Sequence, residues 1–183
     1  MMPEISLNIL DVTQNSVTAG ATLIKISISG DSQKDRLTVS ISDNGCGMTP
    51  EQVQNVTDPF FTSRTTRKVG LGIPFFKLAA EITGGSFNIE SAVGEGTTTT
   101  AVFGLSSIDR MPLGNMADTM RVLIAPNPDL DFVLSMDFDG KGFEMDTRQF
   151  RQILEGIPLS EPQVLQFIES YISENIAACG INF

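Results

Sequence analysis

The sequence contains no histidine, only two cysteines and few basic residues. Without histidine, the chain holds no Ser-His-Asp or Cys-His catalytic group, no histidine metal ligand and no histidine that could carry a phosphoryl group. Two cysteines build neither a disulfide framework nor a zinc site of several cysteines. No apolar run reaches the roughly 18 residues of a membrane-spanning helix, so we expect no membrane segment.

The charge balance is acidic, with 12 Lys and Arg against 22 Asp and Glu and a net charge of −10. Nucleic acids and anionic membranes attract clustered positive charge, so we expect neither as a partner. At 41% hydrophobic residues the chain can build an ordinary core. The N-terminus, Met1-Met2-Pro3-Glu4, has no basic stretch ahead of an apolar one. We therefore expect no signal peptide and a cytoplasmic location.

Hydrophobic periodicity predicts helices alternating with strands. In the first part we expect helices over 4–19, from 50 and over 71–83, strands over 24–29, 37–42, 87–89 and 97–105, and a loop over 58–70. In the second part we expect a helix from 111, strands over 131–139 and 142–146, and helices over 147–155 and 160–180. The pattern predicts an α/β (α+β) two-layer sandwich over residues 1–106 with a C-terminal α/β extension over residues 107–183.

Three Gly-X-Gly pairs fall at junctions between regular elements and loops: Gly45/Gly47, Gly70/Gly72 and Gly94/Gly96. Glycine lets a ring or a neighbouring backbone approach the chain closely. Neither a P-loop nor a dinucleotide-binding glycine fingerprint is present in the sequence.

The middle pair precedes a predicted helix, whose first N–H groups and dipole attract phosphate. Arg64, Arg67 and Lys68 lie directly upstream and could neutralise a phosphate, and the nearness of the Gly70 turn favours this interpretation over a solvated basic loop.

Asp11 and Asn15 are four residues apart and share one face of the first predicted helix. An Asn carbonyl is a suitable oxygen ligand for Mg²⁺, which takes few protein ligands beside phosphates and water. An acid one turn away could orient or deprotonate an attacking water or hydroxyl. A solvated helix face explains the pair equally well.

Four segments in this order resemble the N-box and the three glycine boxes of the GHKL, or Bergerat-fold, ATPases: Asp11–Ser16, Asp43–Gly47, Gly70–Ile73 and Gly94–Thr97. That superfamily includes gyrase-type topoisomerases, heat-shock chaperone ATPases, histidine kinases and mismatch-repair ATPases. The resemblance covers about residues 4–105. It implies a Bergerat-type ATP-binding fold, with a mixed β-sheet covered by helices on one face.

The resemblance also implies roles for single residues around the base. Asp43 resembles the aspartate that accepts the adenine amino group, and Gly45 and Gly47 resemble the glycines beside the base. Thr97 resembles the threonine that supports adenine through water.

On the phosphate side, Gly70, Leu71 and Gly72 resemble the phosphate-binding turn, with Arg64 and Lys68 as further contacts. Asn15 resembles the ligand of Mg²⁺. Asp11 stands where many members have a glutamate base, and it is one methylene shorter.

Asp58–Ser63 is similar to the phenylalanine box of histidine kinases, which favours that branch over the mismatch-repair group. The resemblance thus implies a Mg-ATP-binding ATPase or kinase domain. Because the chain has no histidine, it would act on an unidentified partner protein in trans. Two alternatives are a serine kinase like the anti-sigma factors and a non-catalytic module in which ATP or ADP orders the 58–70 lid. A homodimer is also open.

Overall fold

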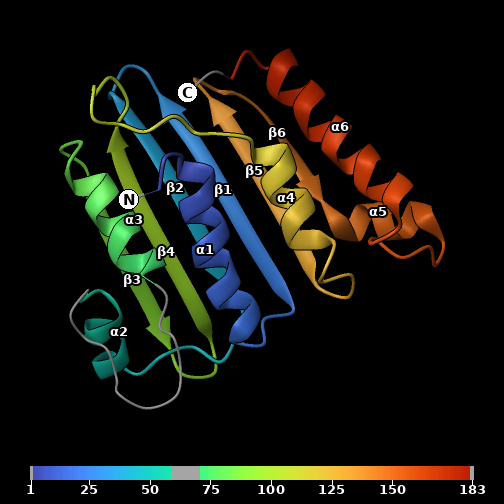
Figure 1. Ribbon diagram of the computed structural model, residues 1–183, viewed down its shortest axis with the longest axis horizontal. Helices are drawn as coiled ribbons and strands as arrows, with labels where there is room; N and C mark the ends of the chain where they lie inside the picture. Colours follow the sequence, from blue (N-terminus) through green and yellow to red (C-terminus); the bar gives the residue numbers. More distant parts are fainter. Residues whose placement is uncertain (1, 59–70, 182–183) are drawn as a thin grey trace.

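In a computed structural model, which describes residues 2–58 and 71–181, the strands form a six-stranded mixed sheet with helices packed on one face (Figure 1). The strands are β1 (Leu23–Asp31), β2 (Arg36–Asp43), β3 (Ser86–Ala92), β4 (Gly96–Gly104), β5 (Asp131–Phe138) and β6 (Lys141–Asp146). The helices are α1 (Ile5–Thr18), α2 (Pro50–Val56), α3 (Gly72–Glu81), α4 (Met116–Ile124), α5 (Thr147–Leu154) and α6 (Pro162–Ala178).

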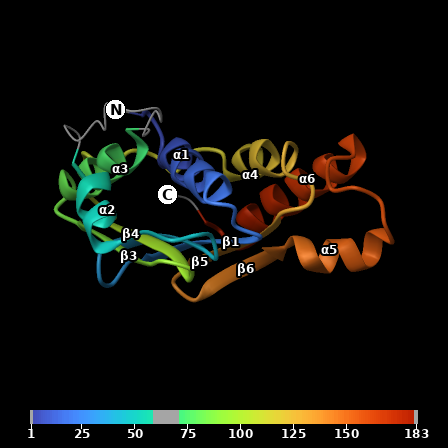
Figure 2. The same cartoon turned by 90° about the horizontal axis from the view of Figure 1, so that it is seen from below.

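The strand order is β3-β4-β2-β1-β5-β6. Neighbouring strands are antiparallel except for β1 and β5, which run parallel in the centre of the sheet. Helices α1, α3, α4 and α6 lie on the same face (Figure 2). The predicted fold class, a mixed sheet covered by helices on one face, is therefore confirmed.

Alternation along the strands explains why only one face is covered. In β1, Ile24 and Ile26 are buried under the helices, whereas Lys25 and Ser27 point to the other face and are exposed. Strand side chains alternate between faces, so this pattern gives one apolar and one polar face. Hydroxyl groups pair across β2 and β4 on the polar face, as Ser42 and Thr98 do at 2.9 Å.

The strands of the C-terminal part extend the same sheet. β5 pairs with β1 along its length, from Leu23 opposite Asp131 to Gly30 opposite Phe138. Met120 and Phe132 are fully buried in one hydrophobic core with residues of α1 and β2. The division that we predict at residue 106 thus falls within a continuous sheet and core.

The helix expected from residue 111 begins later than predicted, at Met116. Gly114 has φ +85°, which a helix does not accommodate, and Asn115 caps the helix by accepting a hydrogen bond from the N–H of Asp118 at 3.0 Å. Helix α2 begins where we expect it, and Thr49 and Gln52 form a reciprocal capping box at its start. Among the helices of residues 2–58 and 71–181, none has the length and apolar character needed to cross a membrane.

Candidate functional site

Helix α1 presents the side chain of Asp11 to the start of α3. Asp11 lies so close to Gly72 that a Cβ on this glycine would be 3.0 Å from the Cβ of Asp11 and 3.1 Å from its Oδ2. Asn15, one turn further on, is exposed. Neither side chain hydrogen-bonds to another residue in the described part of the chain, so both keep oxygen atoms for a ligand.

The carboxylate of Asp43, at the end of β2, is fixed by two donors. Its Oδ1 accepts a hydrogen bond from the N–H of Gly45 at 2.8 Å, and its Oδ2 accepts one from the hydroxyl of the buried Ser16 at 2.5 Å. An ionised carboxylate has about four acceptor positions, so each oxygen can accept a further hydrogen bond. The group is therefore oriented and still able to bind a donor such as an amino group.

Thr97 lies directly opposite Asp43 in the antiparallel pairing of β4 with β2. Its hydroxyl is 2.8 Å from that of Ser91, which itself accepts from the N–H of Met48 at 2.8 Å and donates to the carbonyl of Gly96 at 2.9 Å. Ser91 has one proton to give, so Thr97 is the donor of the pair. The hydroxyl oxygen of Thr97 remains an acceptor beside the Asp43 carboxylate.

The loop after β2 requires glycine at Gly47. This residue has φ +67°, and a Cβ on it would lie 1.9 Å from the carbonyl oxygen of Ala92. The loop is held from two sides, because the N–H of Cys46 donates to Ala19 at 3.0 Å and the N–H of Gly94 donates to Cys46 at 2.8 Å. The end of α1, this loop and the β3–β4 turn thus form one connected wall.

Asn44 anchors the same loop to the start of β1. Its Oδ1 accepts from the N–H groups of Thr22 and Leu23 at 2.9 and 3.0 Å, and its Nδ2 donates to the Thr22 hydroxyl at 2.9 Å. These bonds leave Asn44 with a structural role, while Asp43 faces the buried hydroxyl of Ser16.

Helix α3 begins without a side-chain cap among the described residues. Leu71 occupies the N-cap position without a side-chain hydrogen bond to the helix, and the first turn carries no acidic residue. An uncapped helix start with a positive dipole end favours an anion. Of the predicted phosphate-side residues, Arg64, Lys68 and Gly70 lie outside the described residues, so their contacts stay predictions.

Magnesium would have few protein ligands at this place. Within residues 2–58 and 71–181, no three or more Asp, Glu, Cys or His side chains gather as a metal site would require. Mg²⁺ in phosphate-binding sites is held by one or two oxygen ligands together with substrate phosphates and water. The unbonded side-chain oxygens of Asn15 and Asp11 fit that requirement.

A family model described as "Histidine kinase-, DNA gyrase B-, and HSP90-like ATPase" matches residues 2–107. The chain belongs to this family. The site described above therefore lies in a histidine kinase-, DNA gyrase B- and HSP90-like ATPase domain, and the resemblance found in the sequence is confirmed. The family supports an ATP-binding, kinase-like domain.

The relatives of this ATPase domain include a sensor protein. "Sensor protein SrrB" of Staphylococcus aureus is 32% identical over 102 residues, which are 53% of this chain and 17% of that protein. A solved structure, "Crystal Structure of N terminal domain of a DNA repair protein", has a TM-score of 0.53 and 13% identity, and covers 79% of this chain and 52% of that one. The chain thus matches only about a sixth of the sensor protein and half of the solved chain, and the latter likeness concerns the fold alone.

The structure brings together several residues predicted for the ATPase site. Asp43 and Thr97 are direct neighbours across two strands, Ser16 joins Asp43 to α1, and Asp11 adjoins Gly72.

Sequence reasoning missed Ser16, Ser91 and Asn44 as supporting residues. Ser16 directly follows the predicted Mg²⁺ ligand and Asn44 directly follows Asp43, so the motifs already contained them. Ser91 carries no such signal, since only the pairing of β3 with β4 brings it to Thr97.

Proposed function

We propose that the chain binds Mg-ATP and either hydrolyses it or transfers its terminal phosphoryl group to a partner protein. The observation that carries this proposal is the arrangement of Asp43, whose ionised carboxylate accepts from Ser16 and Gly45 and lies opposite the hydroxyl of Thr97. A carboxylate that only accepts can bind the exocyclic amino group of adenine, which donates.

The proposed triphosphate position extends from Asp43 along α1 toward the start of α3. Asn15 would hold Mg²⁺ through its amide oxygen, and the N–H groups after Leu71 would bind phosphate oxygens. ATP supplies the phosphoryl group. The attacking atom is an oxygen of water or of a hydroxyl, or a ring nitrogen if the acceptor is a histidine. It forms a bond to the terminal phosphorus, the bond from this phosphorus to the bridging oxygen breaks, and ADP leaves with the electron pair.

Asp11 is the proposed acceptor of the proton from the attacking water or hydroxyl. It is the acidic side chain beside Gly72, and its carboxylate has no other hydrogen-bond partner among the described residues. The proposed acceptor lies on another protein if it is a histidine, because this chain has none. We therefore include signal transduction through a partner in the proposal.

Nucleotide binding is tested by isothermal titration calorimetry with ATP and ADP, each with and without Mg²⁺. We expect Asp43→Asn to weaken binding at least a hundredfold, since the amide presents its own donor to the base and loses charge. Asp137→Asn is a matched control, because Asp137 bonds to Ser29 on the polar face of the sheet. Unchanged binding in Asp43→Asn, or no binding by the wild type, would overturn the site assignment.

A regulatory module without turnover is the second candidate. Two features of Asp11 favour this candidate. Its side chain is one methylene shorter than the glutamate base of many family members, so it reaches less far toward an attacking water, and it lies close to Gly72 at the start of α3. Phosphate release is compared between wild type and Asp11→Asn. Release that falls at least tenfold in the variant, at unchanged ADP affinity, supports the ATPase. Equal and negligible release, with ADP binding intact, supports the module.

A further inference from the structure

Residues of α5, α6 and the segment between them line an apolar groove. These two helices lie at the end of the molecule opposite to β3 (Figures 1 and 2). The groove has a volume of about 520 Å³. Three of its lining side chains are large, apolar and exposed: Ile153 to 77%, Ile157 to 51% and Phe167 to 59%. Adjacent exposed apolar side chains of this size are typical of interaction surfaces.

Aromatic rings form one wall of the groove. The ring of Phe150 on α5 lies 5.9 Å from that of Phe167 and 5.6 Å from that of Tyr171, both on α6. Their near-perpendicular arrangement is the favoured edge-to-face geometry. The Tyr171 hydroxyl donates to the carbonyl of Glu144 at 3.2 Å, so the wall is also tied to β6. These contacts hold the groove open in a defined shape.

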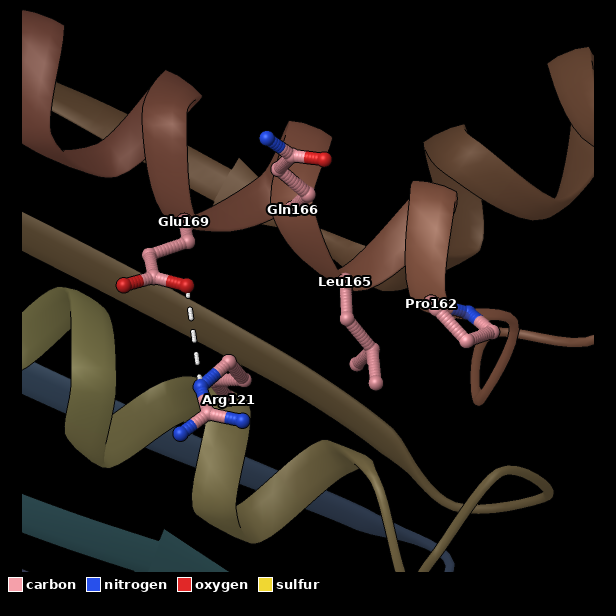
Figure 3. Close-up of a pocket in the computed structure, with 5 residues that line it drawn as sticks. All are labelled: Arg121, Pro162, Leu165, Gln166 and Glu169. Atoms are coloured by element: carbon pink, nitrogen blue, oxygen red, sulfur yellow. Dashed lines mark ion pairs between the residues drawn. The ribbon is translucent and has the colours of Figure 1, made fainter.

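The opposite side of α6 is different. A pocket of about 440 Å³ between α4 and α6 is bordered by Arg121 and Glu169, whose charged groups approach to 3.6 Å (Figure 3). Pro162, Leu165 and Gln166 also line this pocket, so it combines apolar and polar side chains beside the ion pair.

The charged side chain that lines the groove is acidic, Glu161. Arg148 and Arg151 on α5 are both bonded to carboxylates, to Asp146 at 2.7 Å and to Asp131 at 2.8 Å. Glu161 is a lining residue, and none of the lining side chains in the described part of the chain is a lysine or arginine. The whole chain has a net charge of −10. A ligand of this groove gains from carrying positive charge beside its apolar face.

We propose that the groove docks an amphipathic helix of a partner protein. The helix would insert apolar side chains at i, i+3 or i+4, and i+7, and would carry Lys or Arg next to them. A second copy of this chain, which also has a net charge of −10, would place Glu161 near its own equivalent. An anionic lipid surface would be repelled in the same way. This inference concerns the C-terminal segment and does not depend on nucleotide binding.

The test uses the full chain and a displayed library of helical peptides. Each peptide has apolar residues at i, i+3, i+4 and i+7, with Lys, Glu or Ser at the flanking positions. We expect selection to enrich Lys flanks, and the binding of selected peptides, measured by fluorescence anisotropy, to weaken at least tenfold in Ile153→Ser and in Phe167→Ser. Ile108→Ser is the matched control, because Ile108 is 97% exposed and precedes α4. The affinity of the selected peptides is measured with and without ADP. We expect it to be the same in both cases, so the groove can be tested independently of the ATP site.

Several outcomes would overturn the proposal. One is the absence of any enriched peptide, and another is equal enrichment of Glu and Lys flanks. Dimerisation in sedimentation experiments that Ile153→Ser abolishes would assign the groove to a second copy. Flotation with vesicles of anionic lipid that Phe167→Ser abolishes would assign it to a membrane. Thermal melting confirms that each variant folds before its binding is interpreted.

Discussion

The hydroxyl of Ser16 on α1 donates a hydrogen bond to Oδ2 of Asp43 at the end of β2, at a distance of 2.5 Å. Ser16 is buried, with 4% of its surface exposed, so water does not compete for this bond. The bond ties the helix that carries Asp11 and Asn15 to the strand that carries the proposed adenine acceptor. This single contact therefore links the proposed phosphate and Mg²⁺ residues on α1 to the proposed adenine-binding residue on β2.

Ser16→Ala is expected to weaken ADP binding by about tenfold, which corresponds to about 1.4 kcal/mol. A hydrogen bond to a charged group contributes about 1.5–3 kcal/mol, part of which acts on the orientation of Asp43. The measurement is calorimetry with Mg-ADP. Ser6→Ala is the matched control, since Ser6 is also a buried serine of α1 but bonds to Glu4. An equal loss of affinity in both variants would contradict a positioning role for Ser16.

Gly47→Ala is expected to destabilise the chain more than Gly84→Ala. Both glycines have positive φ, +67° and +78°, so both substitutions have the backbone cost of about 1–2 kcal/mol. Only the new Cβ at Gly47 meets another group, the Ala92 carbonyl at 1.9 Å, whereas nothing lies within 4 Å at Gly84. Urea unfolding measures the difference, and equal free energies of unfolding for the two variants would contradict a close approach at Gly47.

Much of the fold could be predicted because single strands and helices carry local signals. The alternation in β1 and β2 and the capping box of α2 are properties of neighbouring residues, and the structure has these elements within a few residues of their expected ends. The parallel pairing of β5 with β1 carries no such signal. The apolar pattern over residues 131–138 suits a central strand beside any partner, so the sequence left the place of the C-terminal strands open.

In the candidate site, too, local motifs could be predicted from the sequence, whereas contacts between distant residues could not. Asp43 and Thr97 belong to motifs that sequence comparison can recognise, but their direct opposition depends on the register of β2 with β4. The link from Ser91 to Thr97 depends on a second register, that of β3 with β4. Register is set by packing and turns over the whole sheet, which residue spacing alone does not contain.

The stabilisation contributed by the ionised Asp146 should be lost in strongly acidic solution, below about pH 4. Hydrogen bonds from Arg148 to its carboxylate lower the pKa of Asp146 below the usual value. Since the folded pKa is lowered, the stabilisation is complete above the unfolded value, about 3.9, and is lost as the pH falls through the folded value. Asp146→Asn should therefore lower the free energy of unfolding by about 1 kcal/mol at pH 7 and leave it unchanged near pH 2.

The control for this variant separates charge from capping. Asp146 also caps α5 by accepting from the N–H of Arg148 at 2.9 Å, and asparagine can keep that bond. Asp146→Ala should lose about 1 kcal/mol more than Asp146→Asn at every pH. Urea unfolding across pH 2–7 measures both, and a loss in Asp146→Asn that does not change with pH would contradict the charge effect.

Removal of residues 107–183 should prevent stable folding of the remaining 1–106. The cut takes β5 from β1 and leaves the parallel edge of β1 unpaired. It also takes the carbonyl groups of Pro112 and Leu113, which accept from the first N–H groups of α1, Ile5 at 3.0 Å and Ser6 at 2.7 Å. We expect the fragment to be insoluble or without a cooperative thermal transition, and co-expression with 107–183 to restore soluble protein. A soluble, monomeric fragment 1–106 that binds ADP as the full chain does would show instead that the nucleotide-binding part is a separate unit.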